Sequence, residues 1–294
     1  MDAGLPEASA TCQMVHDLGA EEVMEAEQIH LTEERETLLI TLYSRAMDNR
    51  REAPILGDKT AEDVARRIDY DFRKLKIHTV DQFIIVTRAK YLDEWTAGFL
   101  ADNPDATVLH LGCGLDSRVF RINPPASVRW YDLDYPEVIE LRRRLYPQRA
   151  GYHMIGASVT DSHWLDQVPA DRPVMIVAEG LTMYLSERDG KQLLQRLTDH
   201  FASGHMAFDA FSRLAVQVAR LHHSIRATGA SFGWAIDDPH EIEKWNPRLQ
   251  LVMEIALTDS AAISKLLWWQ RMVLRVVNHI PAMKRAHRLL RYRF

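Results

Sequence analysis

Apolar side chains recur at near-helical spacing through the first hundred residues. Residues 31–48 place a row of leucines on one face of a helix. Thr32 is a suitable N-cap residue. Glutamates follow it in the first turn, where the helix dipole favours negative charge. Residues 77–100 show the same periodicity and stop close to a proline. We therefore predict that residues 1–104 form a helical region.

Beyond residue 105 the pattern changes to short apolar runs separated by helical stretches. The runs with the length and composition of buried strands are Thr107–Leu111, Val128–Leu133, Val174–Ala178 and His205–Phe211. Helical periodicity fills Pro136–Tyr146 and Glu187–Phe201 between them. Strands that alternate with helices predict βαβ units and a parallel sheet, so residues 105–294 are expected to form an α/β core.

Three later segments complete the predicted architecture. The runs Leu249–Leu257 and Arg271–Val277 are expected to supply closing strands, and residues 211–245 are expected to form a helical cap. No repeat and no flexible linker divides the chain. We therefore predict one α/β domain over residues 1–294.

Composition narrows the function classes. The chain has 294 residues, of which 47% are hydrophobic and 26% charged, as in ordinary globular proteins. Its formal net charge of −5 argues against a nucleic-acid binder, and two cysteines are too few for a disulfide framework or a four-thiolate zinc site. No apolar run reaches the roughly 20 residues of a membrane span, and no signal peptide pattern is visible. We expect a cytoplasmic protein without a membrane span.

Charge is distributed unevenly along the chain. Residues 1–36 hold ten acidic side chains and one basic one, whereas residues 260–294 hold eight basic side chains and no acidic one. These regions either form solvated helix faces that attract each other, or Lys284–Arg293 forms a basic helix that faces an acidic partner or ligand. Both interpretations stay open, and Trp268–Trp269 are expected to pack in a core.

A glycine loop follows the first predicted strand. Gly112 and Gly114 flank one residue directly after the apolar run, where glycine lets the backbone turn sharply and approach a ligand. Ser117 stands where the nicotinamide fingerprint has its third glycine, which disfavours a dinucleotide. Asp134 ends the second strand 20 residues beyond Gly114, the place of a carboxylate that takes both hydroxyls of a ribose.

Three motifs in this order resemble the leucine carboxyl methyltransferase family. They are Leu111–Arg118 (Leu-Gly-Cys-Gly-Leu-Asp-Ser-Arg), Asp132–Pro136 (Asp-Leu-Asp-Tyr-Pro), and Ala178–Gly180 followed by Met183–Tyr184. Within the family the chain is similar to the polyketide O-methyltransferases of the tetracenomycin type, which Gly233–Pro239 also resembles. The resemblance implies a Rossmann-like class I methyltransferase sheet with S-adenosylmethionine as cofactor, and no metal.

The same resemblance implies a cofactor site. Its residues are Arg88, Gly112, Gly114, Asp134, Ser158, Val159 and Glu179. Gly112 would lie under the methionine part, Asp134 would hold the ribose hydroxyls, and Ser158–Val159 would meet the adenine, with serine where the family has an acid. Arg88 would bind the methionine carboxylate and Glu179 its ammonium, and a guanidinium has the bidentate geometry that a carboxylate needs. Arg45 is a candidate second cation.

The methyl acceptor can be a carboxylate or a hydroxyl. A carboxyl group, with a reference pKa near about 4, is ionised at neutral pH and needs no base, whereas a phenol with a pKa of about 10 benefits from one. Since no histidine is evident at the methyl group, we expect methyl esterification of a polyketide-like or peptide-like small molecule. Hydroxyl methylation of a secondary metabolite is the alternative. Tyr184 is a candidate substrate-side residue, with packing as its other interpretation.

The helical segments are expected to cover the acceptor. Phe211, Phe232 and Trp234 would form an apolar wall suited to a ring-bearing molecule. Two other classes are less well supported. The G-x-S-x-G match at residues 229–233 lacks the preceding strand of an esterase elbow, and the intact cofactor motifs disfavour an inactive binding subunit.

Overall fold

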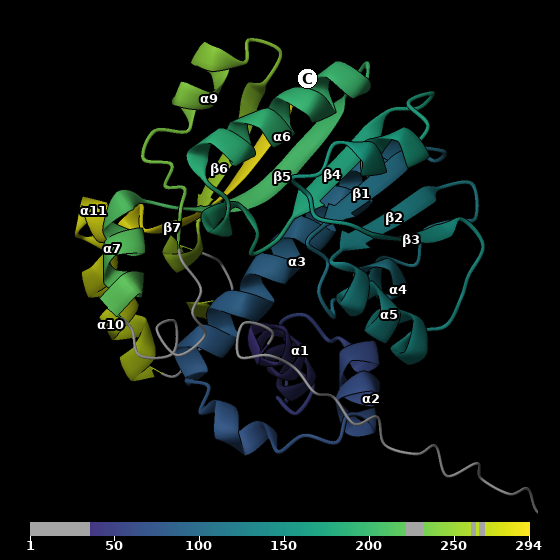
Figure 1. Cartoon of the computed structure of the whole chain (residues 1–294). Coiled ribbons are helices and arrows are strands. Elements are labelled where there is room, and N and C mark those ends of the chain that lie inside the picture. Colours follow the sequence, from purple (N-terminus) through teal and green to yellow (C-terminus); the bar gives the residue numbers. More distant parts are fainter. Residues whose placement is uncertain (1–35, 222–231, 260–262, 265–267) are drawn as a thin grey trace, which may run out of the picture.

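The computed structural model describes residues 36–221, 232–259, 263–264 and 268–294, and it shows a sheet with helices on both faces (Figure 1). Its strands are β1 (Thr107–Leu111), β2 (Arg129–Asp134), β3 (Tyr152–Gly156), β4 (Val174–Ala178), β5 (Gly204–Phe211), β6 (Gln250–Ala256) and β7 (His287–Arg293). The sheet order is β3-β2-β1-β4-β5-β7-β6, with β7 antiparallel to β5 and β6 and the pairs from β3 to β5 parallel.

The helices surround this sheet. The α-helices are α1 (Glu36–Asp48), α2 (Lys59–Arg67), α3 (Thr79–Asp102), α4 (Arg118–Ile122), α5 (Pro136–Leu145), α6 (Glu187–His200), α7 (Arg213–Leu221), α9 (His240–Trp245), α10 (Trp268–Asn278) and α11 (Pro281–Lys284). The 3₁₀ turns are η2 (Phe72–Leu75), η3 (His163–Gln167), η4 (Thr182–Tyr184) and η5 (Leu257–Asp259). No described helix is long and apolar enough to cross a membrane.

Alternate strand residues pack on opposite faces of the sheet, as the two-residue period of a strand requires. Leu109 and Ile176 belong to a core cluster with the leucines of α6. Val108 and Val177 belong to a second cluster with the apolar side chains of α3. Both faces are covered, which explains why these strands are almost continuously apolar.

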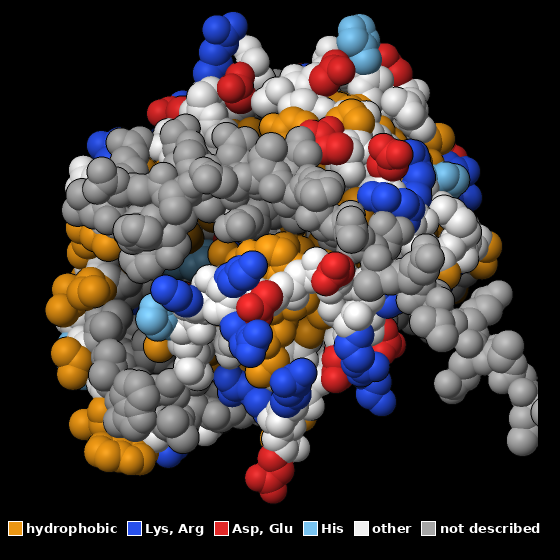
Figure 2. Space-filling model, turned by 60° about the horizontal axis from the view of Figure 1, so that its bottom comes forward, with side chains coloured by type: hydrophobic (Ala, Val, Ile, Leu, Met, Phe, Trp, Pro, Cys, Tyr) orange, Lys and Arg blue, Asp and Glu red, His pale blue; other side chains and the backbone are white. Residues whose placement is uncertain are grey.

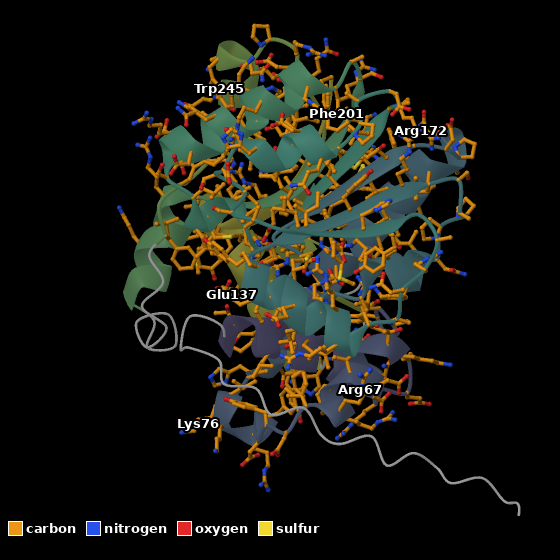
Figure 3. The ribbon with its side chains drawn as sticks, turned by 45° about the vertical axis from the view of Figure 1, so that its right-hand side comes forward. Arg67, Lys76, Glu137, Arg172, Phe201 and Trp245 are labelled. Atoms are coloured by element: carbon orange, nitrogen blue, oxygen red, sulfur yellow. The ribbon has the colours of Figure 1, made fainter. Side chains whose placement is uncertain are left out.

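The N-terminal helices lie at one end of the molecule. Figure 3 shows Arg67 and Lys76 at that end, while Phe201 and Trp245 lie with α6 and α9 at the other. α1 packs on α2 through a cluster that includes Leu39, and it crosses the glycine loop so closely that a Cβ on Gly114 would lie 2.8 Å from Leu38. The helical region therefore forms part of the surface around the loop.

Most predicted elements are confirmed, including the four strands, the two helices between them, the helix at residues 77–100 and the strand at Leu249–Leu257. The helix predicted at residues 31–48 is present from Glu36, and Thr32 lies outside the described residues. The strand β3, which is only partly buried, is missing from the prediction. The cap segment contains α7 and α9, and its residues 222–231 are not described.

Two predictions near the C-terminus are wrong. Arg271–Val277 is not a strand but part of helix α10, and Lys284–Arg293 is not a basic helix but mainly the strand β7. Leu289 and Leu290 are both buried, because β7 lies between two strands and has a covered face on each side. The arginines of this segment therefore flank a buried strand, and the hypothesis of a basic helix that faces an acidic partner is withdrawn.

The outer face of α10 is apolar. Trp268, Met272 and Val276 are each at least half exposed and four residues apart, so they share one side of the helix. Figure 2 shows hydrophobic side chains gathered along this edge of the molecule, at its left. The expectation that Trp268 packs in a core is wrong, since this side chain is 71% exposed, and the side chain of Trp269 lies outside the described ones.

Gly190 in α6 is required by a close approach. A Cβ at this position would lie 2.2 Å from the ring of Trp234, which is buried against the helix, whereas a Cβ on Gly98 of α3 would meet nothing within 4 Å. We expect Gly190→Ala to destabilise the protein by about 1–3 kcal/mol through overpacking, despite the helix propensity of alanine. The matched control Gly98→Ala should be stabilising by roughly 0.5–1 kcal/mol. Urea unfolding measures both, and a stabilised Gly190→Ala variant would contradict the packing described.

Candidate active site

The glycine loop and Asp134 are joined by hydrogen bonds. Gly112 and Gly114 have φ of +62° and +50°, the left-handed region that side chains disfavour. The Gly114 N–H donates to Asp134 Oδ2 at 2.7 Å, and the Tyr135 N–H donates to Oδ1 at 2.8 Å. Burial raises the pKa of Asp134, against the effect of these two donors. Since a carboxylate has about four acceptor positions, Asp134 retains capacity for two further donors.

Asp132, the first acid of the Asp-Leu-Asp motif, is linked to the glycine loop through Arg142. It accepts hydrogen bonds from the Tyr152 hydroxyl at 2.6 Å and from Arg142, whose Nη1 donates to the carbonyl of Gly114 at 2.7 Å. Burial would raise the pKa of Asp132, but Arg142 and His110 outweigh it and lower the pKa to about 2. The two acids of the motif therefore have different surroundings, one enclosed and one at the strand end.

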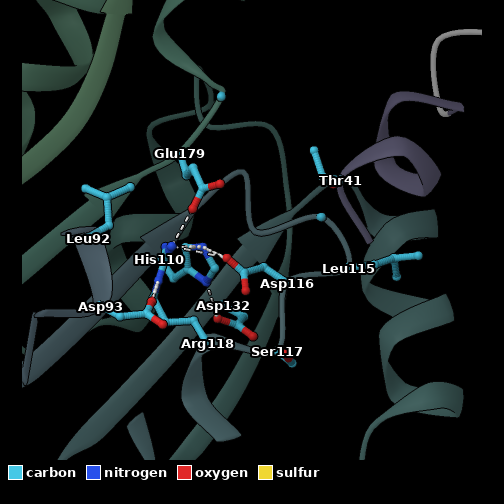
Figure 4. Close-up of polar contacts among 12 residues, drawn as sticks. Thr41, Leu92, Asp93, His110, Leu115, Asp116, Ser117, Arg118, Asp132 and Glu179 are labelled. Atoms are coloured by element: carbon cyan, nitrogen blue, oxygen red, sulfur yellow. Dashed lines mark hydrogen bonds and ion pairs between the residues drawn. The ribbon is translucent and has the colours of Figure 1, made fainter. Parts of the chain in front are cut away.

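Glu179 follows β4 and contacts three arginines from three helices. Its Oε1 accepts from Arg45 of α1 at 2.8 Å and from Arg88 of α3 at 3.1 Å. Its Oε2 accepts from Arg118 of α4 (Figure 4). Burial would raise the pKa of Glu179, but these arginines lower it to about 2, so the carboxylate is ionised at neutral pH. Arg88 and Glu179, which were expected to hold opposite ends of the methionine, are in direct contact with each other.

Further acids neutralise the arginines. Arg118 pairs with Asp93 at 2.7 Å and with Asp116 at 3.3 Å (Figure 4). Arg45 also lies 3.3 Å from Asp116. Arg118 and Asp116 belong to the recognised glycine motif, yet the sequence analysis assigned them no role. A charged side chain that is buried needs a partner of opposite charge. The presence of an arginine and an aspartate in one motif next to a buried strand was therefore the signal that could have pointed to Arg118 and Asp116.

Asp209 is a second site residue that the sequence analysis missed. It lies in β5, accepts from Arg88 Nη1 at 2.8 Å and from the Gly180 N–H at 2.6 Å, and contacts His287 Nε2 at 2.9 Å. Burial would raise the pKa of Asp209, but Arg88 and His287 hold it well below its usual range. A carboxylate inside an otherwise apolar strand was the available signal, because an unpaired charge there would be costly.

The predicted adenine stretch follows β3, next to Asp134. The Ala157 N–H donates to the Asp134 carbonyl at 2.9 Å, which places Ser158 at the same sheet edge. The Ser158 hydroxyl lies 2.8 Å from that of Thr160. Val159 is buried in the core, so a ligand would meet its backbone rather than its side chain.

Tyr184 belongs to a cluster of aromatic rings. It is 42% exposed and stacks on Phe232 at 5.1 Å, and Phe232 contacts Phe211 at 5.6 Å. Trp234 packs instead on α6 in the sheet core, so the expectation that it lines an acceptor wall is wrong. The serine of the G-x-S-x-G match lies outside the described residues.

The family of the chain is shown by comparison with known proteins. Residues 38–198 match the model of the leucine carboxyl methyltransferase family, and the chain belongs to this family. It is an S-adenosylmethionine-dependent O-methyltransferase.

Individual relatives of the chain are also methyltransferases. The chain is 50% identical to the tetracenomycin polyketide synthesis O-methyltransferase TcmP of Streptomyces glaucescens, over 91% of this chain and 99% of the relative. It is 35% identical to the S-adenosyl-L-methionine-dependent methyltransferase dpfgK of Gibberella zeae, over 85% and 92%. A solved structure of a DUF574 family protein from Streptomyces avermitilis is similar in fold, with a TM-score of 0.54 and 15% identity over 85% of this chain and 96% of the other.

The residues present fit S-adenosylmethionine. Arg45 has a buried Nε without a hydrogen-bond partner among the described residues, as a missing ligand carboxylate would leave it. Asp134 has free acceptor positions beside the glycine loop. Gly112 has a positive φ and a Cβ there would lie 3.1 Å from the Leu181 side chain, so glycine suits this turn of the loop.

The ionised carboxylate of Glu179 makes the free energy of unfolding depend on pH in the acid range. Because its native pKa of about 2 lies below the ordinary 4.5, its contribution is complete above pH 4.5 and is lost as pH falls toward 2. We expect Glu179→Gln to lower the free energy of unfolding by about 3–5 kcal/mol at neutral pH, since three buried arginines each lose one of their anionic partners. The difference from wild type should shrink progressively below pH 4.5 in urea unfolding.

The control for this measurement is Glu187→Gln at the exposed start of α6. Glu187 pairs with Lys191 at 2.6 Å on the surface, so its loss should cost no more than about 0.5 kcal/mol. A Glu179→Gln difference that stayed constant throughout the acid range would show that the arginines do not hold this carboxylate ionised.

Proposed function

We propose that this enzyme transfers a methyl group from S-adenosylmethionine to a carboxylate oxygen of a small, ring-bearing, polyketide-like acceptor. The observation that carries the proposal is the match of residues 38–198 to a family described by carboxyl methylation, together with 50% identity to an O-methyltransferase of polyketide synthesis. An ionised carboxylate needs no base, so the protein mainly has to align the acceptor and exclude water.

The cofactor would bind along the carboxyl edge of the sheet. Its activated sulfonium methyl group supplies the chemistry. Gly112 and Gly114 would let it approach the backbone, Asp134 would accept its ribose hydroxyls, and the loop at Ser158–Val159 would meet the adenine. These assignments are supported by the geometry of the loop and by the acceptor positions left on Asp134.

The methionine end would bind at the Glu179 cluster. Glu179 retains an acceptor position for the ammonium, while Arg88 and Arg45 would share the carboxylate. Because Arg45 and Arg88 come from the N-terminal helices, the proposal treats residues 1–294 as one methyltransferase domain.

The acceptor would lie beside the aromatic cluster of Tyr184, Phe211 and Phe232. The exposed face of Tyr184 offers a stacking surface for a flat ring, and the neighbouring rings give it apolar surroundings. A small molecule rather than nucleic acid is also consistent with the net charge of −5.

Hydroxyl methylation is the second candidate. His287, which the sequence analysis did not consider, contacts Asp209 at the same sheet edge, and a histidine oriented by a carboxylate is a suitable base for a phenol. Because His287 is available as a base, the choice of a carboxylate acceptor rests on the family match alone.

Binding of S-adenosylhomocysteine tests the assignment of Asp134. We expect Asp134→Asn to weaken binding about tenfold or more, because a charged acceptor of the ribose hydroxyls is replaced by an amide. Titration calorimetry on cofactor-free protein measures this, and urea unfolding checks that the variant is folded. Asp166→Asn is the control, since that side chain is 80% exposed in η3. Equal affinities for wild type and Asp134→Asn would remove Asp134 from the site.

The product identifies the acceptor atom. We expect incubation with methyl-deuterated cofactor and a panel of fused-ring aromatic carboxylic acids to yield methyl esters, which alkali cleaves. The matching phenols should remain unchanged under the same conditions. Mass spectrometry before and after alkaline hydrolysis distinguishes the two products, and an alkali-stable aryl ether would establish the second candidate instead.

A further inference from the structure

The antiparallel strand β7 brings a histidine to the carboxyl edge of the sheet. β7 pairs with β5 so that His287, its first residue, lies opposite Phe211, the last residue of β5. The parallel strands β1 and β4 also end at this edge, where Gly112 and Glu179 follow them. A parallel strand in the place of β7 would carry its first residue to the opposite edge.

Asp209 fixes the orientation of this histidine. The imidazole Nε2 lies 2.9 Å from Asp209 Oδ2, and the edge of one ring meets the face of the other at 4.5 Å between His287 and Phe211. Because Asp209 is an ionised acceptor, the proton between them belongs to Nε2, and Nδ1 is the nitrogen left for another molecule. The His287 side chain is 15% exposed, so it is not completely enclosed by the protein.

The histidine continues the aromatic cluster at which the acceptor is proposed to bind. The rings of Tyr184, Phe232, Phe211 and His287 contact one another in that order. Arg88 and Asp209 both act on the phenol of Tyr184, whose pKa burial raises, so this phenol faces the same charged groups as His287. An acceptor on Tyr184 would therefore lie on the aromatic cluster to which His287 belongs.

We propose that His287 binds the acceptor: its Nδ1 takes up a proton when an aromatic carboxylate enters and donates a hydrogen bond to the carboxylate oxygen that is not methylated. The inference rests on the proposed carboxylate acceptor. It assigns to this histidine a positioning role, because the donated bond turns the other oxygen toward the methyl group.

The charges around His287 agree with this role. Asp209 faces it from β5, Arg88 from α3, and Glu179 from the turn after β4. Burial lowers the pKa of His287, with Arg88 adding to this effect and both carboxylates opposing it, so the imidazole is neutral in the free enzyme at neutral pH. An incoming carboxylate adds a negative charge and favours the imidazolium.

The methyl transfer to an ionised carboxylate needs no general base. The ionised carboxylate oxygen forms a bond to the methyl carbon, while the sulfur keeps the electron pair of the bond that breaks. The ester is neutral and no longer stabilises the imidazolium, so His287 returns its proton to solvent. One proton is taken up on binding and one is released with the product.

Calorimetry tests the proton uptake directly on the wild-type protein. The probe is 2-naphthoate, titrated into the complex with S-adenosylhomocysteine at about pH 7.5, above the ordinary histidine pKa, in buffers that differ in ionisation enthalpy. We expect the observed heat to vary with the buffer in proportion to an uptake approaching one proton per site, and 2-naphthol to show no such variation. Saturable binding of 2-naphthoate without proton uptake overturns the inference, and so does the absence of binding.

Kinetics of His287→Gln provide the second test. We expect the KM for 2-naphthoate to rise about tenfold or more, while kcat stays within about threefold, because a charge-assisted hydrogen bond to the acceptor is lost. In the wild type this KM should rise with pH above about 6.5, and in the variant it should not change. His205→Gln, at the opposite edge of β5, is the matched control and should leave KM unchanged.

The outcomes separate this inference from the proposed function. If kcat falls by orders of magnitude at unchanged KM, His287 acts as a base and the inference is wrong. If 2-naphthol is methylated and 2-naphthoate is not, the proposed carboxylate acceptor fails. If the ester forms without proton uptake, the proposed function survives and the role of His287 does not. Should the variant fail to fold, the wild-type calorimetry decides.

Discussion

A single buried carboxylate organises this molecule. Glu179 stands at the end of a central strand and accepts hydrogen bonds from Arg45, Arg88 and Arg118, which belong to three separate helices. Replacing such a buried ion pair by well-packed apolar residues is often neutral or stabilising, so the cluster is weak evidence for stability. Its clearer effect is to fix where α1, α3 and α4 meet the sheet. Two arginines of the N-terminal helices therefore lie in the same buried cluster as Arg118 of the glycine motif.

The fold could be predicted wherever local pattern and tertiary environment agree. The buried parallel strands β1 and β4 are mostly apolar, and their bounds coincide with the predicted runs. The strand β7 was not predicted, because its arginines suggested a solvated helix. In the structure it lies between two other strands. Periodicity also misjudged α10, since a run rich in valine suits a strand until its exposed face is known.

The candidate site could be predicted only in part from the sequence. The sequence proposed Gly112, Asp134 and Glu179 as site residues because motifs and strand ends place them. It proposed Arg88 only through the family resemblance. Asp209 and His287 were not proposed, since their meeting depends on the order β5-β7 and on the direction of β7. The sequence of Lys284–Arg293 does not reveal that His287 contacts Asp209, because the two residues are 78 positions apart.

The direction and place of β7 also affect how the chain assembles during synthesis. In the described sheet β6 pairs with β7 alone, and β7 follows β6 in the sequence. A nascent chain that has emerged only as far as Ala256 therefore exposes the free edge of β5 and leaves β6 without a neighbour. Sheet completion waits for His287–Arg293, and until then the growing polypeptide carries an edge on which intermolecular pairing can begin.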